Sequence, residues 1–415
     1  MESQGSKVYT YRWVVLFVFA LANAMIQIHW VNYAPITTKA ALYYGVTPLK
    51  IGALSMLYMT VFLVFCIPAS YVIDTYGIKV GVGFGAILTA IFGVMKAIFP
   101  DNYQMIFYAY IGLAIAQPFI MNAMTKVGAN WFPIRERAMA VGLAALSQYI
   151  GISLAMGLTP FLVNAYGMEG MLNIYAVASV ITSLFFLLLC RDRPDLPPDI
   201  ETSAERIAVF AGLKNIFKDR DMIMVLFIFF IGLGMFNAVT TWIEQILAPR
   251  GLTSEQAGLI GTALMLGGIL GAIILPIMSD IKRKRKPFLI ICMAGMFPGL
   301  IGLTFVTSFA WLAASAFVMG FFIMAAGPIG FQYGAEISYP VPESTSQGMI
   351  LLSGQISGII FILMMDKFRL SDGSMTPFMI AFIVMMLAVV VLTLRLRESP
   401  LILADGRPVQ PVNKD

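Results

Sequence analysis

Residues 191–220, RDRPDLPPDIETSAERIAVFAGLKNIFKDR, form the longest polar interval in a chain of 415 residues. The first part is rich in proline and aspartate, and residues 204–217 have the pattern of a short amphipathic helix at a membrane interface. Six long apolar runs precede this interval and six follow it. The interval therefore predicts an N-terminal six-helix bundle over 1–190, a linker over 191–220 and a C-terminal six-helix bundle over 221–415.

Each apolar run reaches about 20 residues, the length that an α-helix needs to cross a bilayer. The runs lie at 13–36, 51–73, 78–99, 104–127, 137–163, 170–190, 221–247, 255–279, 287–307, 311–335, 347–365 and 376–396. No cleavable signal pattern precedes the first run, so we expect it to remain as the first membrane helix.

The composition excludes most other classes of protein. Hydrophobic residues make up 59% of the chain and charged residues only 12%, and the mean hydropathy is +0.85. A water-soluble domain carries about 25% charged residues, so a soluble enzyme, a nucleic-acid binder and a disordered scaffold are excluded. The apolar runs are far longer than the strands of a membrane β-barrel. The chain is therefore predicted to be an all-α membrane protein, with no enzymatic activity.

The loop charges predict the orientation. With the N-terminus inside, 21 of the 27 lysines and arginines fall on the inner side, and the outer side holds only Lys39, Lys50, Lys96, Arg250, Lys367 and Arg369. Positive residues concentrate in cytoplasmic loops, so both termini and the linker are predicted to be cytoplasmic.

Metals and cofactors are not expected. A single histidine, His29, excludes a multi-histidine metal site. The three cysteines lie inside apolar runs without metal-ligand spacing, which is typical of small buried side chains rather than a disulfide framework.

The two halves of the chain resemble each other at an offset near 207 residues. The matching pairs are Pro133 with Pro340, Glu136 with Glu343, Gln148 with Gln355, Gly151 with Gly358 and, with a slip of one residue, Asp74 with Asp280. Two parallel six-helix repeats around an axis along the membrane normal describe the major facilitator fold. Twelve helices in two pseudo-symmetric halves are therefore predicted.

Short motifs in the loops agree with this fold. The stretch Ser70-Tyr-Val-Ile-Asp74-Thr-Tyr-Gly77-Ile-Lys79 resembles the facilitator loop motif, and so does Trp131-Phe-Pro133-Ile-Arg-Glu136-Arg137-Ala-Met-Ala. Asp74 is expected to bind a helix N-terminus or an arginine, and glycine at position 77 permits a tight turn. The predicted conformational residues, which do not contact substrate, are Asp74, Gly77, Lys79, Glu136, Arg137, Asp280 and Glu343.

The cargo of such a fold binds near the membrane midplane, where polar groups are costly and seldom without a role. The candidate substrate residues are Trp30, Tyr33, His29, Gln117, Gln148, Tyr149, Phe236, Asn237, Tyr333 and Gln355. Packing, helix–helix hydrogen bonds and an interfacial aromatic belt are the alternative roles for these side chains. Glu244, near a helix end, is expected to be an exposed rim carboxylate.

The lining helices lack a charged residue near their middle. An anionic cargo would require an arginine or lysine partner, and only His29 offers a titratable group for proton coupling. An aromatic and amide-lined site suits a neutral or cationic cargo held by cation–π contacts.

Several stretches resemble the feline leukaemia virus subgroup C receptor-related transporters. They are Trp30-Val-Asn-Tyr33, Tyr44-Gly-Val-Thr47, Leu54-Ser-Met-Leu-Tyr-Met59, Gly330-Phe-Gln-Tyr-Gly-Ala-Glu336-Ile-Ser-Tyr-Pro340, Thr345-Ser-Gln-Gly348 and Gln355-Ile-Ser-Gly358. The resemblance implies transport of choline and ethanolamine, and the group has also been discussed for haem export.

The same resemblance implies roles for individual residues. Trp30 matches the tryptophan that stacks on the quaternary ammonium, and Gln355 matches a glutamine that lines the site. For the glutamine of the fifth helix, an ungapped match gives Tyr149 and the repeat offset gives Gln148. The tyrosine of the seventh helix is Asn237 here, which removes one wall of the aromatic cage.

The sequence thus predicts a monomeric transporter of a small organic solute in a bacterial inner membrane, with no nucleic-acid partner. Facilitated uniport of a choline-like amine by alternating access is favoured. One alternative is a proton-coupled symporter of an organic acid or another metabolite that uses His29. Another is a ligand sensor or haem-binding membrane protein that does not transport.

Overall fold

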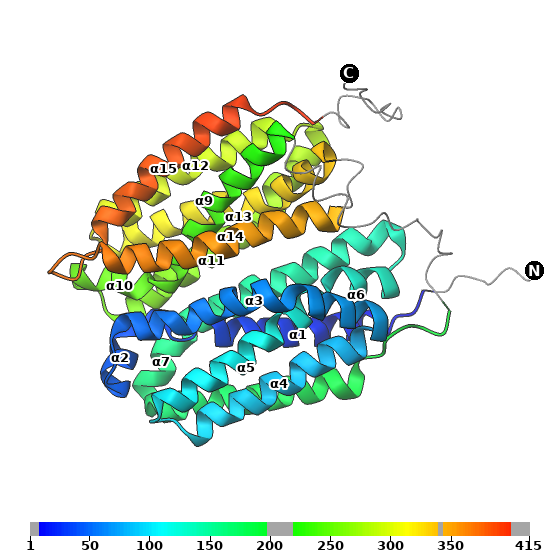
Figure 1. Cartoon of the computed structure of the whole chain (residues 1–415), viewed down its shortest axis with the longest axis horizontal. Helices are drawn as coiled ribbons and strands as arrows, with labels where there is room; N and C mark the ends of the chain where they lie inside the picture. Colours follow the sequence, from blue (N-terminus) through cyan, green and yellow to red (C-terminus); the bar gives the residue numbers. More distant parts are fainter. Residues whose placement is uncertain (1–7, 197–218, 339–342, 400–415) are drawn as a thin grey trace, which may run out of the picture. The chain divides into compact units, whose positions relative to one another are not determined.

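The computed structural model describes residues 8–196, 219–338 and 343–399. These residues form helices joined by short turns, without a strand among them (Figure 1). The first repeat contains α1 (Arg12–Val31), η1 (Ala34–Ile36), α2 (Thr37–Tyr44), α3 (Pro48–Tyr76), α4 (Ile78–Ile98), α5 (Tyr103–Met121), α6 (Met124–Trp131) and α7 (Ile134–Leu189). The second contains α9 (Arg220–Thr241), α10 (Ile243–Leu247), η2 (Ala248–Arg250), α11 (Ser254–Lys282), α12 (Lys286–Phe305), α13 (Phe309–Ile337), α14 (Glu343–Lys367) and α15 (Thr376–Arg395).

Eleven helices of the described chain are long and apolar enough to cross a membrane. The longest, α7, contains two of the predicted spans. Its backbone leaves the helical conformation at Gly167, where φ is 72° and ψ is −179°. Only glycine adopts this conformation without strain, and Gly167 interrupts the helix between the two predicted spans. With α7 counted as two spans, the prediction of twelve membrane helices is confirmed.

The outer surface of the helices is apolar. Large hydrophobic side chains such as Ile67, Leu188 and Trp311 are mostly exposed. In water such a surface would drive aggregation, whereas in a bilayer it faces acyl chains. The exposed apolar side chains therefore agree with a chain that spans the membrane many times.

Two compact units make up the structure. One comprises residues up to 204 together with Thr240–Thr262, and the other comprises residues 205–239 and all residues from 263 onward. The expected amphipathic helix at 204–217 lies outside the described residues. The predicted boundaries at 190 and 220 remain predictions.

Close helix contacts shape the first unit. A Cβ atom on Gly151 of α7 would overlap the backbone of Ala24 on α1, and the Asn23 amide nitrogen donates to Ala144 O (3.0 Å) and Ser147 Oγ (2.9 Å). Small residues and side-chain amides join helices in this way where no hydrophobic force operates between them. Helix α1 is therefore fixed against α7.

Residues 240–262 pack within the same unit through Glu244. Its Oε2 atom accepts hydrogen bonds from the backbone nitrogen and hydroxyl of Thr38, both at 3.0 Å, and from Gln245 Nε2 at 2.7 Å. The Glu244 side chain is only 4% exposed, so the prediction of an exposed rim carboxylate is wrong. The chain turns at the buried Trp242 between α9 and α10, and this turn directs Glu244 towards α2.

Candidate functional site

Trp30 lies in the last turn of α1, where two reciprocal hydrogen bonds join it to α3. Its indole Nε1 donates to Ser55 O (3.3 Å), and Ser55 Oγ donates to Trp30 O (3.1 Å). The ring is 8% exposed. Because the only polar atom of the indole is already bonded within the bundle, the surface left for a cation is the π-face of the ring. The π-face attracts cations through the ring quadrupole.

Two buried polar atoms, one on α1 and one on α3, have no hydrogen-bond partner among the described residues. They are Gln27 Nε2, one turn before Trp30, and Tyr58 Oη, one turn after Ser55. Both side chains are almost completely buried. Buried polar groups nearly always have a partner, and a buried group without one in the protein points to water or a ligand. Sequence reasoning missed Tyr58, because it lies inside an apolar run and looked like a packing residue.

The other predicted residues of the first unit come from α5 and α7. Gln148 is half-buried, and its amide nitrogen lies 3.3 Å from the sulfur of Met124. Tyr149 is also half-buried, and Gln117 is buried. Tyr33 is buried, and its hydroxyl shares a hydrogen bond of 2.8 Å with Tyr44. These residues offer amide and aromatic groups rather than charges.

In the second unit, a hydrogen bond of Asn237 joins α9 to α14 beside Gln355. The Asn237 amide donates to the carbonyl of Gly354, the residue before Gln355, at 3.3 Å. Gln355 and Phe236 are half-buried. Tyr333 lies near the C-terminal end of α13, and its hydroxyl donates to the backbone carbonyl of Arg397 (2.8 Å). This bond gives the Tyr333 hydroxyl a structural role.

His29 is fully buried and lies against a lysine. Its Nδ1 atom is 3.1 Å from Lys96 Nζ, and its Nε2 atom is 2.7 Å from Ser179 Oγ. Lys96 was counted among the charges of the outer side, at the end of the predicted run 78–99. It lies in the last turn of α4 with 0% of its surface exposed. The error arises because a lysine at the end of an apolar run looks like a loop residue when the packing of its helix is not known.

The loop between α3 and α4 contains the first predicted conformational residues. Asp74 pairs with Lys126, with 3.5 Å between the charged atoms. The N-terminus of α4 is held by Asp192, whose Oδ1 atom accepts from Ile78 N (2.5 Å) and Lys79 N (3.4 Å). A carboxylate is favourable there because it meets unpaired N–H groups and the positive end of the helix dipole.

The corresponding loop between α11 and α12 is built similarly. Glu398 Oε1 accepts from Arg285 N (2.8 Å) and Lys286 N (3.1 Å). The Arg285 guanidinium binds Asp280 and lies 3.1 Å from Glu336. Burial opposes the charge of Arg285, but hydrogen bonds to these two carboxylates and their negative charges raise its pKa above the ordinary value.

Of the remaining predicted conformational residues, the structure describes the side chains of two. Glu136 forms an ion pair with Arg12 at 2.9 Å, and the Lys79 side chain is exposed. The side chains of Arg137 and Glu343 lie outside the described residues.

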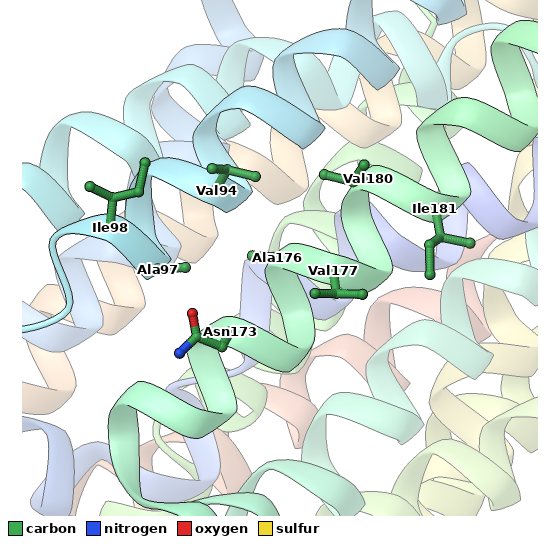
Figure 2. Close-up of a pocket in the computed structure, with 8 residues that line it drawn as sticks. All are labelled: Val94, Ala97, Ile98, Asn173, Ala176, Val177, Val180 and Ile181. Atoms are coloured by element: carbon green, nitrogen blue, oxygen red, sulfur yellow. The ribbon is translucent and has the colours of Figure 1, made fainter.

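A groove of about 370 Å³ lies between α4 and α7 (Figure 2). It is lined by Val94, Ala97, Ile98, Asn173, Ala176, Val177, Val180 and Ile181. None of the predicted substrate residues lines it. Ile98, Val177 and Ile181 are exposed on the apolar surface, so this groove suits acyl chains of the bilayer rather than a polar cargo. In the described ranges, His, Cys, Asp and Glu side chains form no group of three that could hold a metal.

Comparison with known families identifies a match over residues 13–362 to the model described as "Major Facilitator Superfamily". The chain is 29% identical over 388 residues to solute carrier family 49 member A3 of Xenopus tropicalis, covering 88% of this chain and 80% of the relative. It is 27% identical over 389 residues to choline/ethanolamine transporter FLVCR1 of Mus musculus, covering 86% and 70%.

Among solved structures, the chain resembles a bacterial homologue of the human lysosomal transporter Spinster in an inward-facing, unoccupied conformation. The TM-score is 0.74 at 14% identity, over 94% of this chain and 97% of the other. At this identity the likeness supports the fold alone.

Proposed function

Because the chain belongs to the Major Facilitator Superfamily, we propose that this membrane transporter carries a small organic amine of the choline or ethanolamine type by alternating access. The observation that carries the proposal is the fixed, buried indole of Trp30, whose N–H is already bonded to α3. Relatives at about 27% identity are named choline/ethanolamine transporters. The sequence resemblance assigns the ammonium-stacking role to the same tryptophan.

The remaining polar groups support a cargo with hydrogen-bonding capacity. In the first unit these are Gln27, Tyr58 and Gln148, and in the second Asn237 and Gln355. Asparagine at 237, in place of the family's tyrosine, removes an aromatic wall and adds an amide. Amides bind the N–H groups of a primary amine better than they bind methyl groups. We therefore propose that ethanolamine-like amines bind at least as well as choline.

The membrane potential supplies a driving force for a cation. A potential of 100 mV contributes about 2.3 kcal/mol per elementary charge. A monomer in a bacterial inner membrane remains our proposal for the working form, although the relatives compared above are animal proteins.

The alternative cargoes fit these contacts less well. An organic acid would need a cationic partner, but Lys96 is wholly buried against His29 and two tyrosine rings. A haem iron would need a nitrogen of His29, and both nitrogens have partners inside the bundle.

The test is uptake of radiolabelled ethanolamine and choline into proteoliposomes with an inside-negative potential and an acidic interior, so that either a potential or a proton gradient can drive uptake. Trp30→Ala is expected to reduce uptake about tenfold or more, because a desolvated cation–π contact contributes about 2 kcal/mol or more. The matched control is Trp311→Ala, since that tryptophan is 70% exposed and should transport normally. Wild-type uptake by Trp30→Ala, or no uptake of either amine by the wild type, would refute the proposal.

A further inference from the structure

Lys96 is a buried lysine for which the described residues offer no anionic partner. No described carboxylate lies within ion-pair distance of its Nζ atom, and its side chain is fully enclosed. Its contacts are the Nδ1 atom of His29 and the faces of Tyr110 and Tyr33, with ring centres at 4.6 and 5.6 Å. An ammonium group removed from water without a counter-charge is costly. A protein keeps such a group in a membrane helix chiefly where it has a function.

The hydrogen bonds around His29 determine where its proton lies. Ser179 Oγ donates its single proton to Tyr175 O (2.6 Å), so towards His29 it can only accept. The Nε2 atom of His29 must therefore carry a proton and donate to Ser179. In the neutral ring Nδ1 is then an acceptor for Lys96. A second proton, on Nδ1, would place two positive charges 3.1 Å apart with no hydrogen bond between them.

The other titratable groups that face this pair are tyrosines. Tyr175 of α7 lies edge-on to the His29 ring, and Tyr110 of α5 and Tyr33 lie beside Lys96. Tyr58 of α3 contacts Tyr110, and Tyr44 of α2 bonds to Tyr33. These elements present no described acid or second base at the pair. The pair therefore carries one positive charge or none.

The repeat shows that packing does not require these polar residues. Adding 207 to His29, Lys96 and Ser179 gives Phe236, Leu303 and Met386, which are all apolar. Leu303 and Met386 are buried like their counterparts. The second repeat thus fills the same places without charge. At these three positions, the first repeat has groups that can bind and release a proton and the second repeat has none.

We propose that His29 and Lys96 form a proton-binding site and that the transporter exchanges this proton for the amine. His29 precedes Trp30 by one residue on α1, so an amine cation stacked on Trp30 and a proton on the pair place two positive charges in one low-dielectric bundle. Their repulsion makes binding of one cation favour release of the other. This inference rests on the proposed amine transport and replaces uniport with proton–amine exchange. Exchange of one proton for one amine cation moves no net charge, so a proton gradient takes the place of the membrane potential as the driving force.

The first test does not depend on the cargo. Because His29 is the only histidine, protein labelled with ¹⁵N-histidine and purified through a histidine-free tag gives the NMR signals of this one ring. In the wild type we expect the proton on Nε2 of His29. The Nδ1 signal should be displaced in Lys96→Leu, which removes the hydrogen-bond donor. It should not be displaced in the control Lys50→Leu, because Lys50 is exposed. A proton on Nδ1 alone, or identical spectra for the wild type and Lys96→Leu, would overturn the proton site.

The second test measures protons released when ethanolamine is added to purified protein in weakly buffered micelles containing a pH dye. The wild type should release up to about one proton per bound amine, as expected for two coupled sites. Lys96→Leu and His29→Phe should release about fivefold fewer protons or less at equal occupancy. Amine binding without proton release in the wild type, or equal release in Lys96→Leu, would overturn the exchange.

These outcomes separate the two proposals. If no amine binds, the proposed cargo and its exchange fail, whereas the NMR result still decides whether His29 and Lys96 form a proton site. Melting temperatures of all variants show whether each one is folded.

Discussion

The interiors of the two repeats differ although their helices correspond. In the first repeat, His29, Lys96 and Ser179 join α1, α4 and α7 through polar contacts. In the second repeat, phenylalanines fill the interior between α14 and α15. Phe361, Phe378 and Phe382 contact one another with ring centres 5.0–6.1 Å apart. Apolar packing can therefore serve this architecture, and the polar interior of the first repeat needs a functional explanation.

The loops of the two repeats, unlike the interiors, share the same hydrogen-bonding and ion-pair chemistry. Asp192 and Glu398 lie 206 residues apart in the sequence, and each accepts backbone N–H groups at the start of the helix that follows the loop motif. Asp74 and Asp280 each pair with a cation, although the cations come from different positions. We infer that polar contacts present in both repeats stabilise the fold, and that polar contacts present in only one repeat serve the function.

The largest expected effect comes from placing a charge in the apolar interior. Leu303→Lys should lower the free energy of unfolding by about 3 kcal/mol, because the second repeat offers no histidine to bond the ammonium. The measurement is the thermal unfolding of purified protein. Leu303→Met is the control and should retain stability, because it conserves volume. A Leu303→Lys variant as stable as the wild type would show that either repeat tolerates a buried lysine.

A smaller loss is expected at the turn before α4. Gly77 has φ 93° and ψ 174°, and a Cβ atom there would overlap the Asp192 carboxylate. Gly77→Ala should therefore cost about 2 kcal/mol in thermal unfolding, through backbone strain and displacement of Asp192. The counterpart near position 283 is an arginine with φ 49°, in the left-handed helical region. Arg283→Gly should change stability by less than about 1 kcal/mol. Equal effects of the two substitutions would contradict this difference between the turns.

The smallest effects concern the two capping acids. Asp192→Asn and Glu398→Gln should each reduce stability by about 1 kcal/mol, because an amide oxygen still accepts hydrogen bonds but loses the attraction of the carboxylate for the helix dipole. Parallel melting curves of both variants, at low and high salt, measure this. A loss in only one variant would mean that the two loops are not equivalent.

Much of the fold could be predicted from hydropathy, because a spanning helix must be apolar over its whole length. The twelve spans followed from this rule, whereas the repeat followed from residue matches at an offset near 207. Trp30 and Gln355 were singled out because polar and aromatic groups are conspicuous in apolar helices. Lys96 was missed because its location depends on the packing of α4 against α1. Asp192 was missed because the helix that it caps begins more than a hundred residues earlier.

The central claim is that the polar interior of the first repeat serves transport rather than stability. The most direct measurement compares melting temperature and ethanolamine uptake for Lys96→Leu, the variant that gives this position the residue of the second repeat. We predict a melting temperature equal to or above that of the wild type, since apolar replacement of a buried charge is often neutral or stabilising. Uptake should fall about tenfold, as expected for the loss of a coupling free energy near 1.4 kcal/mol. A lowered melting temperature with a parallel loss of uptake, or unchanged uptake, would contradict the claim.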